Sequence, residues 1–336
     1  MSTEGMSMVG SSSDRTRRPG GVWIAIVGLV LLGAVIAVVV TVTKGGATTE
    51  NPFAGASLYV YADSSAAKAA KVANGTEDSA AFGQLARVPT AIWLLPEAHP
   101  SGEITEFVSK IEGDAAVKGQ LPVFVVYGIP SRDCSNYSAG GASDQEYPLW
   151  VSAIVAGIGS SPAVVILEPD ALALAPSCGT EVATTAFIKD AAARLSTSPA
   201  TTVYLDGGHS DWLEPAQMAE LLKSAGVSGV RGFATNVSNF NTTEDERDYA
   251  TSLSELLGGA HFVIDTSRNG MGSTGEWCNP PGRTVGDTPT GVDDGTAQDA
   301  SLWIKNPGES DGECNGGPPA GQWWPSQALE LTRGGV

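Results

Sequence analysis

Histidine is scarce in this chain, and no cluster of histidine and cysteine stands out. The three histidines are His99, His209 and His261, and neither a CxxC nor an HxxxH spacing occurs. Zinc sites are typically built from closely spaced Cys and His ligands. The sequence therefore argues against a metal centre, and we expect no cofactor.

Basic residues are also few. The 336 residues include 19 Lys and Arg against 37 Asp and Glu, which gives a formal net charge of −18. Proteins that bind nucleic acid use clustered Lys and Arg to neutralise phosphates. We therefore expect no nucleic-acid partner, and interpret the acidic charge as the ordinary solubility of an exported protein.

Cysteine is limited to four residues, all in the part of the chain that we expect to be exported: Cys134, Cys178, Cys278 and Cys314. An even number of cysteines in an exported domain predicts disulfides. Three pairings are possible, and we favour the one that joins neighbours along the chain, Cys134–Cys178 and Cys278–Cys314.

Long apolar runs are absent except for one, Val22–Val42. A helix of this length would extend about 30 Å, which matches the hydrocarbon core of a bilayer. Signal-peptide apolar regions are shorter, about 7–15 residues. Arg15, Arg17 and Arg18 precede the run, and Lys44 follows it. This charge bias favours a single-pass anchor with an exported domain over a long cleaved signal.

The rest of the chain predicts one folded domain. We expect a disordered cytoplasmic tail at 1–21, the anchor at 22–43, a Gly/Thr-rich linker at 44–56 and the domain at 57–336. Within the domain, apolar β-type runs alternate with helix-like segments, which predicts seven or eight parallel strands in an α/β fold. SLYVYAD, at residues 57–63, is the first predicted strand.

Aspartates follow four of these apolar runs: Asp133, Asp170, Asp206 and Asp265. Strands that deliver acids from their C-terminal ends predict a β/α barrel with its active site on that face. A carboxylate-rich site with little histidine favours acid–base chemistry on a neutral substrate such as a polysaccharide.

Hydrolysis of a glycosidic bond requires one protonated carboxyl and a second carboxylate that activates water or attacks carbon. Asp170 fits the acid, since it leaves a strongly apolar strand, and Asp133 on the preceding loop would raise its affinity for a proton. Tryptophans near predicted strand ends could stack on sugar rings. For Trp150, within a helix-like segment, we expect core packing instead.

Seven strings occur in order between about Leu58 and Gln327 and together carry a specific resemblance. They are YGIPSRDCSNYSAGG, VILEPDALAL, YLDGGHSDW, ATNVSNF, IDTSRNG, EWCNPPGR and WIKNPGESDGEC. This set resembles glycoside hydrolase family 6, which contains inverting β-1,4-glucanases of both the endoglucanase and the cellobiohydrolase type. The family's two disulfides agree with the favoured pairing.

The resemblance implies a role for each matching residue. Asp170 matches the general acid, and Asp133 the aspartate that raises the pKa of that acid and engages a water chain. Asp311 matches the proposed base, and Tyr127 the tyrosine that favours distortion of the sugar. Further residues match substrate-binding or site-ordering positions: Trp93, Asp206, Trp277, Trp303, Lys305 and Glu309.

The fold implied is a distorted, incomplete parallel β/α barrel of about seven strands. The short loops favour an open cleft and cleavage at internal bonds of cellulose or a related β-glucan by a monomeric enzyme. The alternative is a catalytically weak glycan-binding protein of the cell envelope that keeps the family cleft. A metal-dependent deacetylase on the same barrel is a remote third option, given the few histidines.

Overall fold

The computed structural model describes residues 50–334. The predicted tail, the predicted anchor and the linker up to residue 49 lie outside the described residues. Among residues 50–334, no helix combines the length and the apolar character needed to cross a membrane.

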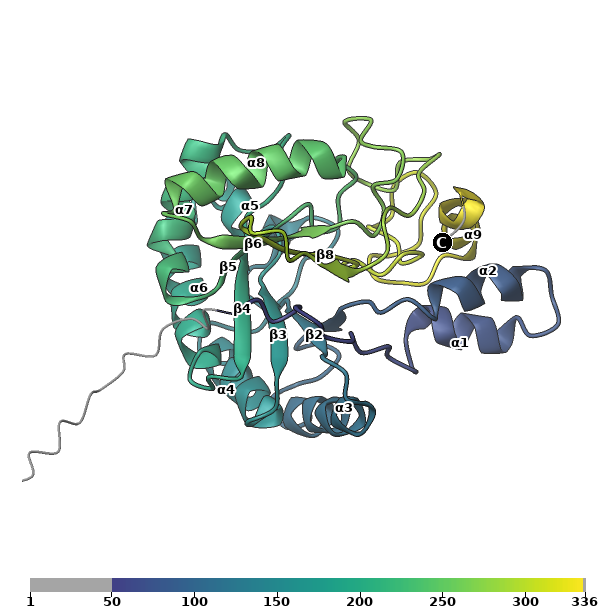
Figure 1. Cartoon of the computed structure of the whole chain (residues 1–336), viewed down its shortest axis with the longest axis horizontal. Coiled ribbons are helices and arrows are strands. Elements are labelled where there is room, and N and C mark those ends of the chain that lie inside the picture. The colour runs from purple at the N-terminus through teal and green to yellow at the C-terminus, as the bar shows by residue number, and fades with distance from the viewer. Residues whose placement is uncertain (1–49, 335–336) are drawn as a thin grey trace, which may run out of the picture. The chain divides into compact units, whose positions relative to one another are not determined.

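A mostly parallel sheet forms the centre of the described domain (Figure 1). Its strand order is β1-β2-β3-β4-β5-β6-β8-β7, and every neighbouring pair is parallel except β7 with β8. The strands are β1 (Ile92–Leu94), β2 (Val123–Val126), β3 (Ala163–Leu167), β4 (Thr201–Asp206), β5 (Gly232–Thr235), β6 (His261–Asp265), β7 (Thr290–Gly291) and β8 (Gln298–Leu302).

Helices connect the parallel strands and pack on the outer face of the sheet (Figure 1). A smaller group, α1, α2 and α9, packs together beside one edge. The helices are α1 (Ser65–Val72), α2 (Asp78–Leu85), α3 (Ile104–Lys118), α4 (Tyr147–Ile158), α5 (Ala171–Cys178), α6 (Glu181–Leu195), α7 (Pro215–Ser224), α8 (Thr243–Leu256) and α9 (Pro325–Leu331).

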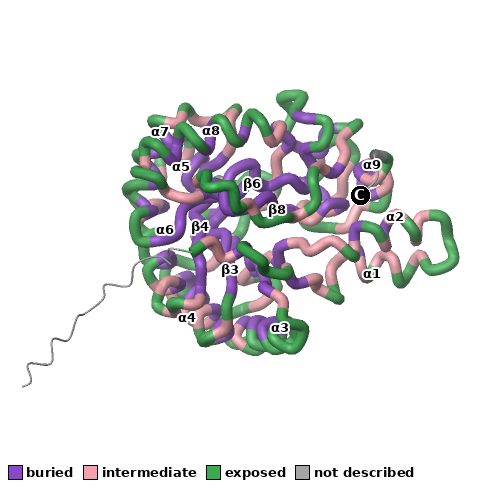
Figure 2. Tube along the Cα trace, in the orientation of Figure 1, coloured by how far each residue is buried: buried purple, intermediate pink, exposed green. Residues whose placement is uncertain are grey.

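The central strands are buried on both faces, which explains why they are continuous apolar runs rather than alternating ones (Figure 2). Phe124 and Val126 of β2 belong to the outer core, between sheet and helices. Val125 of the same strand and Tyr127, just beyond it, belong to a second core on the inner face. Because side chains alternate along a strand, one run supplies both cores.

The first predicted strand forms only in part. Leu58 makes a single parallel bridge to Leu121, and the chain then turns away from the sheet. Ser64 ends this segment by capping α1, where its hydroxyl accepts the N–H of Ala67 at 3.2 Å. The segment therefore extends the sheet by one bridge and leads into the α1–α2 pair.

Candidate active site

The four predicted aspartates all lie at or beyond the C-terminal ends of strands. Asp206 and Asp265 are the last residues of β4 and β6, and Asp170 lies just beyond β3. Asp133 lies on the loop that follows β2. Since these strands are parallel, their carboxyl ends share one edge of the sheet, as the sequence predicts.

Asp170 is the residue before α5, and its backbone is left-handed with a φ of 68°. Such a conformation is strained for a residue with a side chain and recurs at functional sites. Its N–H donates to Oδ2 of Asp206 at 3.0 Å. Burial, together with the nearby charge of Asp133, raises the pKa of Asp170 to about 7. Asp170 therefore holds a proton up to neutral pH.

Asp133 has the same backbone strain, with a φ of 59°. Its Oδ2 accepts the N–H of Ser138 at 2.7 Å, and burial raises its pKa. The next residue, Cys134, is bonded to Cys178 at the end of α5, so this loop is tied to the helix that begins after Asp170. Cys278 is bonded to Cys314, and both favoured disulfides are thereby confirmed.

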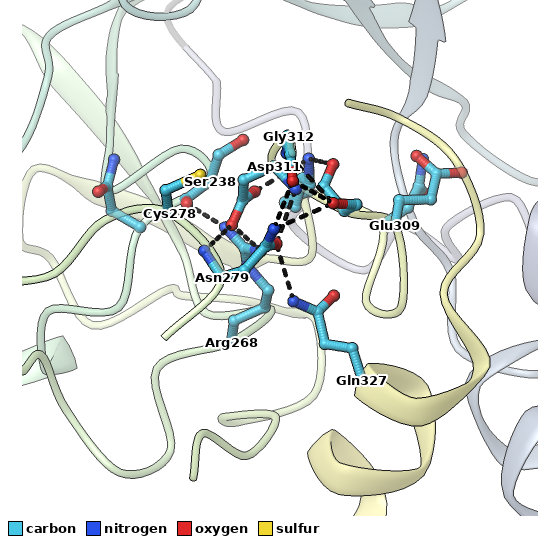
Figure 3. A network of polar contacts seen from close by, with 12 residues as sticks. Ser238, Arg268, Cys278, Asn279, Glu309, Asp311, Gly312 and Gln327 are labelled. Atoms are coloured by element: carbon cyan, nitrogen blue, oxygen red, sulfur yellow. Dashed lines mark hydrogen bonds and ion pairs between the residues drawn. The ribbon is translucent and has the colours of Figure 1, made fainter. Parts of the chain in front are cut away.

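Asp311 is buried within a network of polar contacts on the loop after β8 (Figure 3). Its Oδ2 accepts from Arg268 at 2.9 Å and from the backbone N–H of Asn279 at 3.0 Å, and its Oδ1 lies 3.3 Å from Nζ of Lys305. Burial alone would raise the pKa of Asp311, but the two cations hold it below its ordinary value. This carboxylate is therefore ionised where Asp170 is not.

Arg268 pairs with Asp311 and is not among the residues predicted from sequence, although it lies within the IDTSRNG string. Its guanidinium is fully buried, stacks over the ring of Phe240 at 4.3 Å and donates to the carbonyl of Ser238. A buried arginine needs a carboxylate partner. This rule could have suggested that an arginine within the motif pairs with an acid, but it does not identify that acid.

The three predicted catalytic carboxyls share one electrostatic neighbourhood. Asp133, Lys305 and Asp311 all act on the pKa of Asp170. The two acids raise it, and the lysine lowers it. Coulombic effects weaken with distance, so these three groups lie near Asp170. The structure thus brings together residues that are 37 to 178 positions apart in the chain.

Tyr127 and Trp93 form an aromatic pair beside these acids. Their rings meet edge to face with centroids 5.1 Å apart. Nε1 of Trp93 donates to the carbonyl of Ile304 at 2.8 Å, and Lys305 Nζ lies 5.9 Å from the centroid of the Trp93 ring. Burial raises the pKa of Tyr127, and Asp170 and Asp133 raise it further, so its hydroxyl stays protonated and lies close to both.

The remaining predicted binding residues are mostly engaged within the protein. Asp206 orders the backbone of Asp170, as described above, and also accepts the N–H of Gly208 at 3.0 Å. Oε1 of Glu309 accepts the hydroxyl of Ser65 at 2.6 Å, which links this loop to α1. These contacts fit site-ordering roles.

The two remaining predicted stacking residues, Trp277 and Trp303, differ sharply. Trp277 is 52% exposed and lies 6.0 Å from the ring of Tyr137. Trp303 is 1% exposed and belongs to the cluster of α1, α2 and α9, where it donates to the carbonyl of Asp287 at 3.0 Å. A ring so completely buried cannot stack on a sugar, so the prediction for Trp303 is wrong. Its position directly after a strand did not reveal that its ring points into the cluster of α1, α2 and α9.

Removal of the Trp277 ring tests its predicted role. We expect Trp277→Ala to raise the KM for a soluble oligosaccharide roughly threefold to tenfold with little change in kcat, because one stacking contact is worth about 0.5–1.5 kcal/mol. Met271→Ala, on the same loop and 62% exposed, is the control. Equal KM values for both variants and the wild type would contradict the stacking role.

Asp265, the fourth strand-end acid, has a structural role. Its carboxylate accepts four backbone N–H groups at 2.9 to 3.1 Å, from Ser238, Ser267, Ile304 and Lys305. These donors come from the loops after β5, β6 and β8, and the last of these loops carries Asp311. The buried carboxylate therefore fixes the backbone that presents Arg268 and Lys305.

The geometry defines a class of enzyme. A carboxyl that keeps its proton, Asp170, and a carboxylate that stays ionised, Asp311, both lie beyond the carboxyl ends of strands in one mostly parallel sheet, a combination suited to an acid–base hydrolase. The family model for glycosyl hydrolases family 6 matches residues 53–334. The chain belongs to this family.

Characterised relatives agree in sequence and in structure. The chain is 45% identical over 279 residues to Endoglucanase A of Cellulomonas fimi, an alignment that covers 82% of this chain and 61% of that protein. It is 46% identical over 255 residues to Endoglucanase 1 of Streptomyces sp. (strain KSM-9), covering 73% of this chain and 69% of that protein. The structure of the endoglucanase Cel6 from Mycobacterium tuberculosis, in complex with methyl-cellobiosyl-4-deoxy-4-thio-β-D-cellobioside, superposes with a TM-score of 0.79 at 42% identity, covering 84% of this chain and 98% of that one.

Proposed function

We propose that this protein hydrolyses internal β-1,4-glucosidic bonds of cellulose or a related β-glucan with inversion of configuration. The observation that carries the proposal is the opposite displacement of two pKa values, with Asp170 raised to about 7 and Asp311 lowered. Two carboxyls whose surroundings push their pKa values apart are the acid and base of such a site. The names of the relatives from Cellulomonas fimi and Streptomyces support the endo mode.

The reaction follows from the two protonation states. Asp170 donates its proton to the glycosidic oxygen as the bond to the sugar carbon breaks. A water molecule on the opposite face of the ring attacks that carbon, and its proton passes to Asp311, either directly or through a water chain beside Asp133. Room for this water is what separates inverting from retaining enzymes. In the same scheme, Tyr127 favours distortion of the sugar at the bond that is cleaved.

The shape and the partners follow the same proposal. We infer that the curled, mostly parallel sheet is an incomplete barrel whose open edge accepts a glucan chain. The partner is β-1,4-glucan or a cello-oligosaccharide, with no nucleic acid, and the protein acts as a monomer. The complex of the Mycobacterium tuberculosis enzyme with a thio-linked oligosaccharide supports the choice of ligand.

Release of reducing ends from carboxymethyl cellulose, with viscosity followed in parallel, tests the activity. We expect a large early fall in viscosity per bond cleaved, since internal cleavage shortens chains quickly. Asp170→Ala should bind a cello-oligosaccharide without releasing ends. If wild type and variant both bind but neither releases ends, the protein is a glycan-binding protein and the proposal fails.

We further propose that residues 22–43 anchor the protein in the cytoplasmic membrane with the catalytic domain outside. The length of the apolar run and the arginines before it support this placement. Membrane fractionation of the full-length protein should find it in the pellet. A soluble product trimmed at its N-terminus would show secretion after cleavage instead.

A further inference from the structure

Glu168 is a buried carboxyl that the reaction scheme does not use. It follows the last residue of β3, lies two positions before Asp170 and has a left-handed backbone with a φ of 52°. Its side chain is 0% exposed, so it cannot touch a substrate. Burial raises its pKa to about 7.

The hydrogen bonds of the Glu168 side chain lead to neighbouring elements. Its carboxyl accepts the backbone N–H of Gly128 at 3.0 Å and of Ile129 at 3.1 Å, just beyond β2. Oε1 also accepts the hydroxyl of Tyr147, at the start of α4, at 2.8 Å. One side chain thus joins the carboxyl ends of the two strands that carry the predicted acid and its neighbour.

The backbone held by Glu168 is the base of the loop that contains Asp133. The carbonyl of Gly128 accepts the N–H of Ala142 at 2.9 Å, which closes the far end of that loop. Arg132, next to Asp133, donates to the carbonyl of Tyr127 at 2.7 Å. Gly128 has no room for a side chain, because a Cβ there would lie 2.6 Å from Trp150. Both ends of the loop therefore depend on the short segment that Glu168 binds.

We propose that Glu168 is a positioning residue for the hydrolysis, which locks the ends of β2 and β3 together and so keeps the carboxylate of Asp133 beside that of Asp170. This inference rests on the proposed function. The Glu168 side chain suits the task because its two oxygens accept hydrogen bonds from all three surrounding donors. An amide in its place would turn an N–H₂ group toward a backbone N–H and lose one of these bonds.

The pH at which Asp170 loses its proton depends on the position of the Asp133 carboxylate. After burial, the charge of Asp133 is the strongest influence that raises the pKa of Asp170. If Asp133 moves away, Asp170 loses its proton at a lower pH. Three other charged or titratable groups that face Asp170 belong to different elements: Asp206, Lys305 and Asp311. Tyr127 also faces Asp170 and lies next to the segment that Glu168 binds, but its raised pKa keeps it uncharged.

The test compares the wild type with Glu168→Gln and with Glu112→Gln. Glu112 is a matched control, since it is a buried carboxyl on α3 whose pKa burial also raises to about 7, and its buried Oε1 has no hydrogen-bond partner among the described residues. For Glu168→Gln we expect kcat on a soluble cello-oligosaccharide to fall about tenfold or more, with KM within about twofold, because small displacements of a reacting group are costly. The alkaline limb of its pH–rate profile should move to lower pH, whereas Glu112→Gln should keep the wild-type limb.

A second variant covers a failure of Glu168→Gln to fold. Tyr147→Phe removes one hydroxyl donor from Glu168 and keeps the ring, and it should shift the alkaline limb in the same direction by a smaller amount. An unchanged limb and kcat in Glu168→Gln, or in Tyr147→Phe where the former does not fold, would overturn the positioning role alone. Absence of turnover by the wild type would overturn this role together with the proposed function.

Discussion

Replacement of Asp170 by Asn is expected to lower kcat on a soluble β-glucan by about 10²–10⁴-fold, the contribution typical of a positioned general acid. Asparagine keeps the shape of the side chain but carries no transferable proton. The wild-type rate should fall as the pH rises above about 7, because Asp170 then loses the proton that it must donate. Initial rates across this pH range, measured with enough substrate to saturate the enzyme, check both statements.

For the same variant we expect the opposite effect on stability, which should improve relative to the wild type although activity falls. The folded-state pKa of Asp170 is raised, so its contribution to stability is fully present below the unfolded pKa and is lost as the pH rises through the folded value near 7. Asp170→Asn avoids this loss. Relative to the wild type, its free energy of unfolding should improve as the pH rises toward 7. Asp114→Asn, at an exposed site, should change neither rate nor stability; a wild-type rate in Asp170→Asn would contradict the acid assignment.

The second large effect is expected for Asp311→Asn. This change leaves Arg268 fully buried beside a neutral group, and loss of one partner from a buried ion pair typically costs about 3–5 kcal/mol of stability. It also removes the proposed base, so kcat should fall by about 10²-fold or more. Urea unfolding and kinetics on the folded variant measure the two effects separately.

Asp299→Asn is a matched control for that experiment. Asp299 on β8 pairs with Arg231 at 2.8 Å, and both side chains are buried outside the proposed site. This variant should lose stability as Asp311→Asn does but keep the wild-type kcat per folded molecule. The pH dependence adds a check: the folded pKa of Asp311 is lowered, so its stabilising effect is present above the unfolded pKa and disappears as the pH falls through the folded value. Equal kcat in the two variants would contradict the role of Asp311.

Much of the fold could be predicted because buried strands appear in the sequence as continuous apolar runs. The runs VFVVYG and AVVIL are apolar at successive positions, and the structure uses alternate residues for the outer and inner cores. The aspartates that follow these runs could therefore be placed at one edge of the sheet from the sequence. Cysteine order along the chain also gave the correct disulfides.

Other features depend on contacts that no local pattern records. Trp303 follows β8 as a cleft residue would, yet it packs against α2 and α9, which come from distant parts of the chain. Glu168 and Asp170 lie two positions apart in the same motif and differ in orientation, since one is wholly buried and the other is partly exposed. Both residues have a left-handed backbone, and this conformation sets the direction of each side chain beyond the strand end. No local sequence pattern predicts such a conformation for residues other than glycine.

In the proposed mechanism, water displaces the leaving sugar in a single step between a protonated Asp170 and an ionised Asp311. The most direct measurement is the anomeric form of the new reducing end when a defined cello-oligosaccharide is cleaved, followed by proton NMR before mutarotation. Inversion at a β-linked carbon predicts that the α-anomer forms first. Initial release of the β-anomer would require a covalent intermediate and would contradict the account.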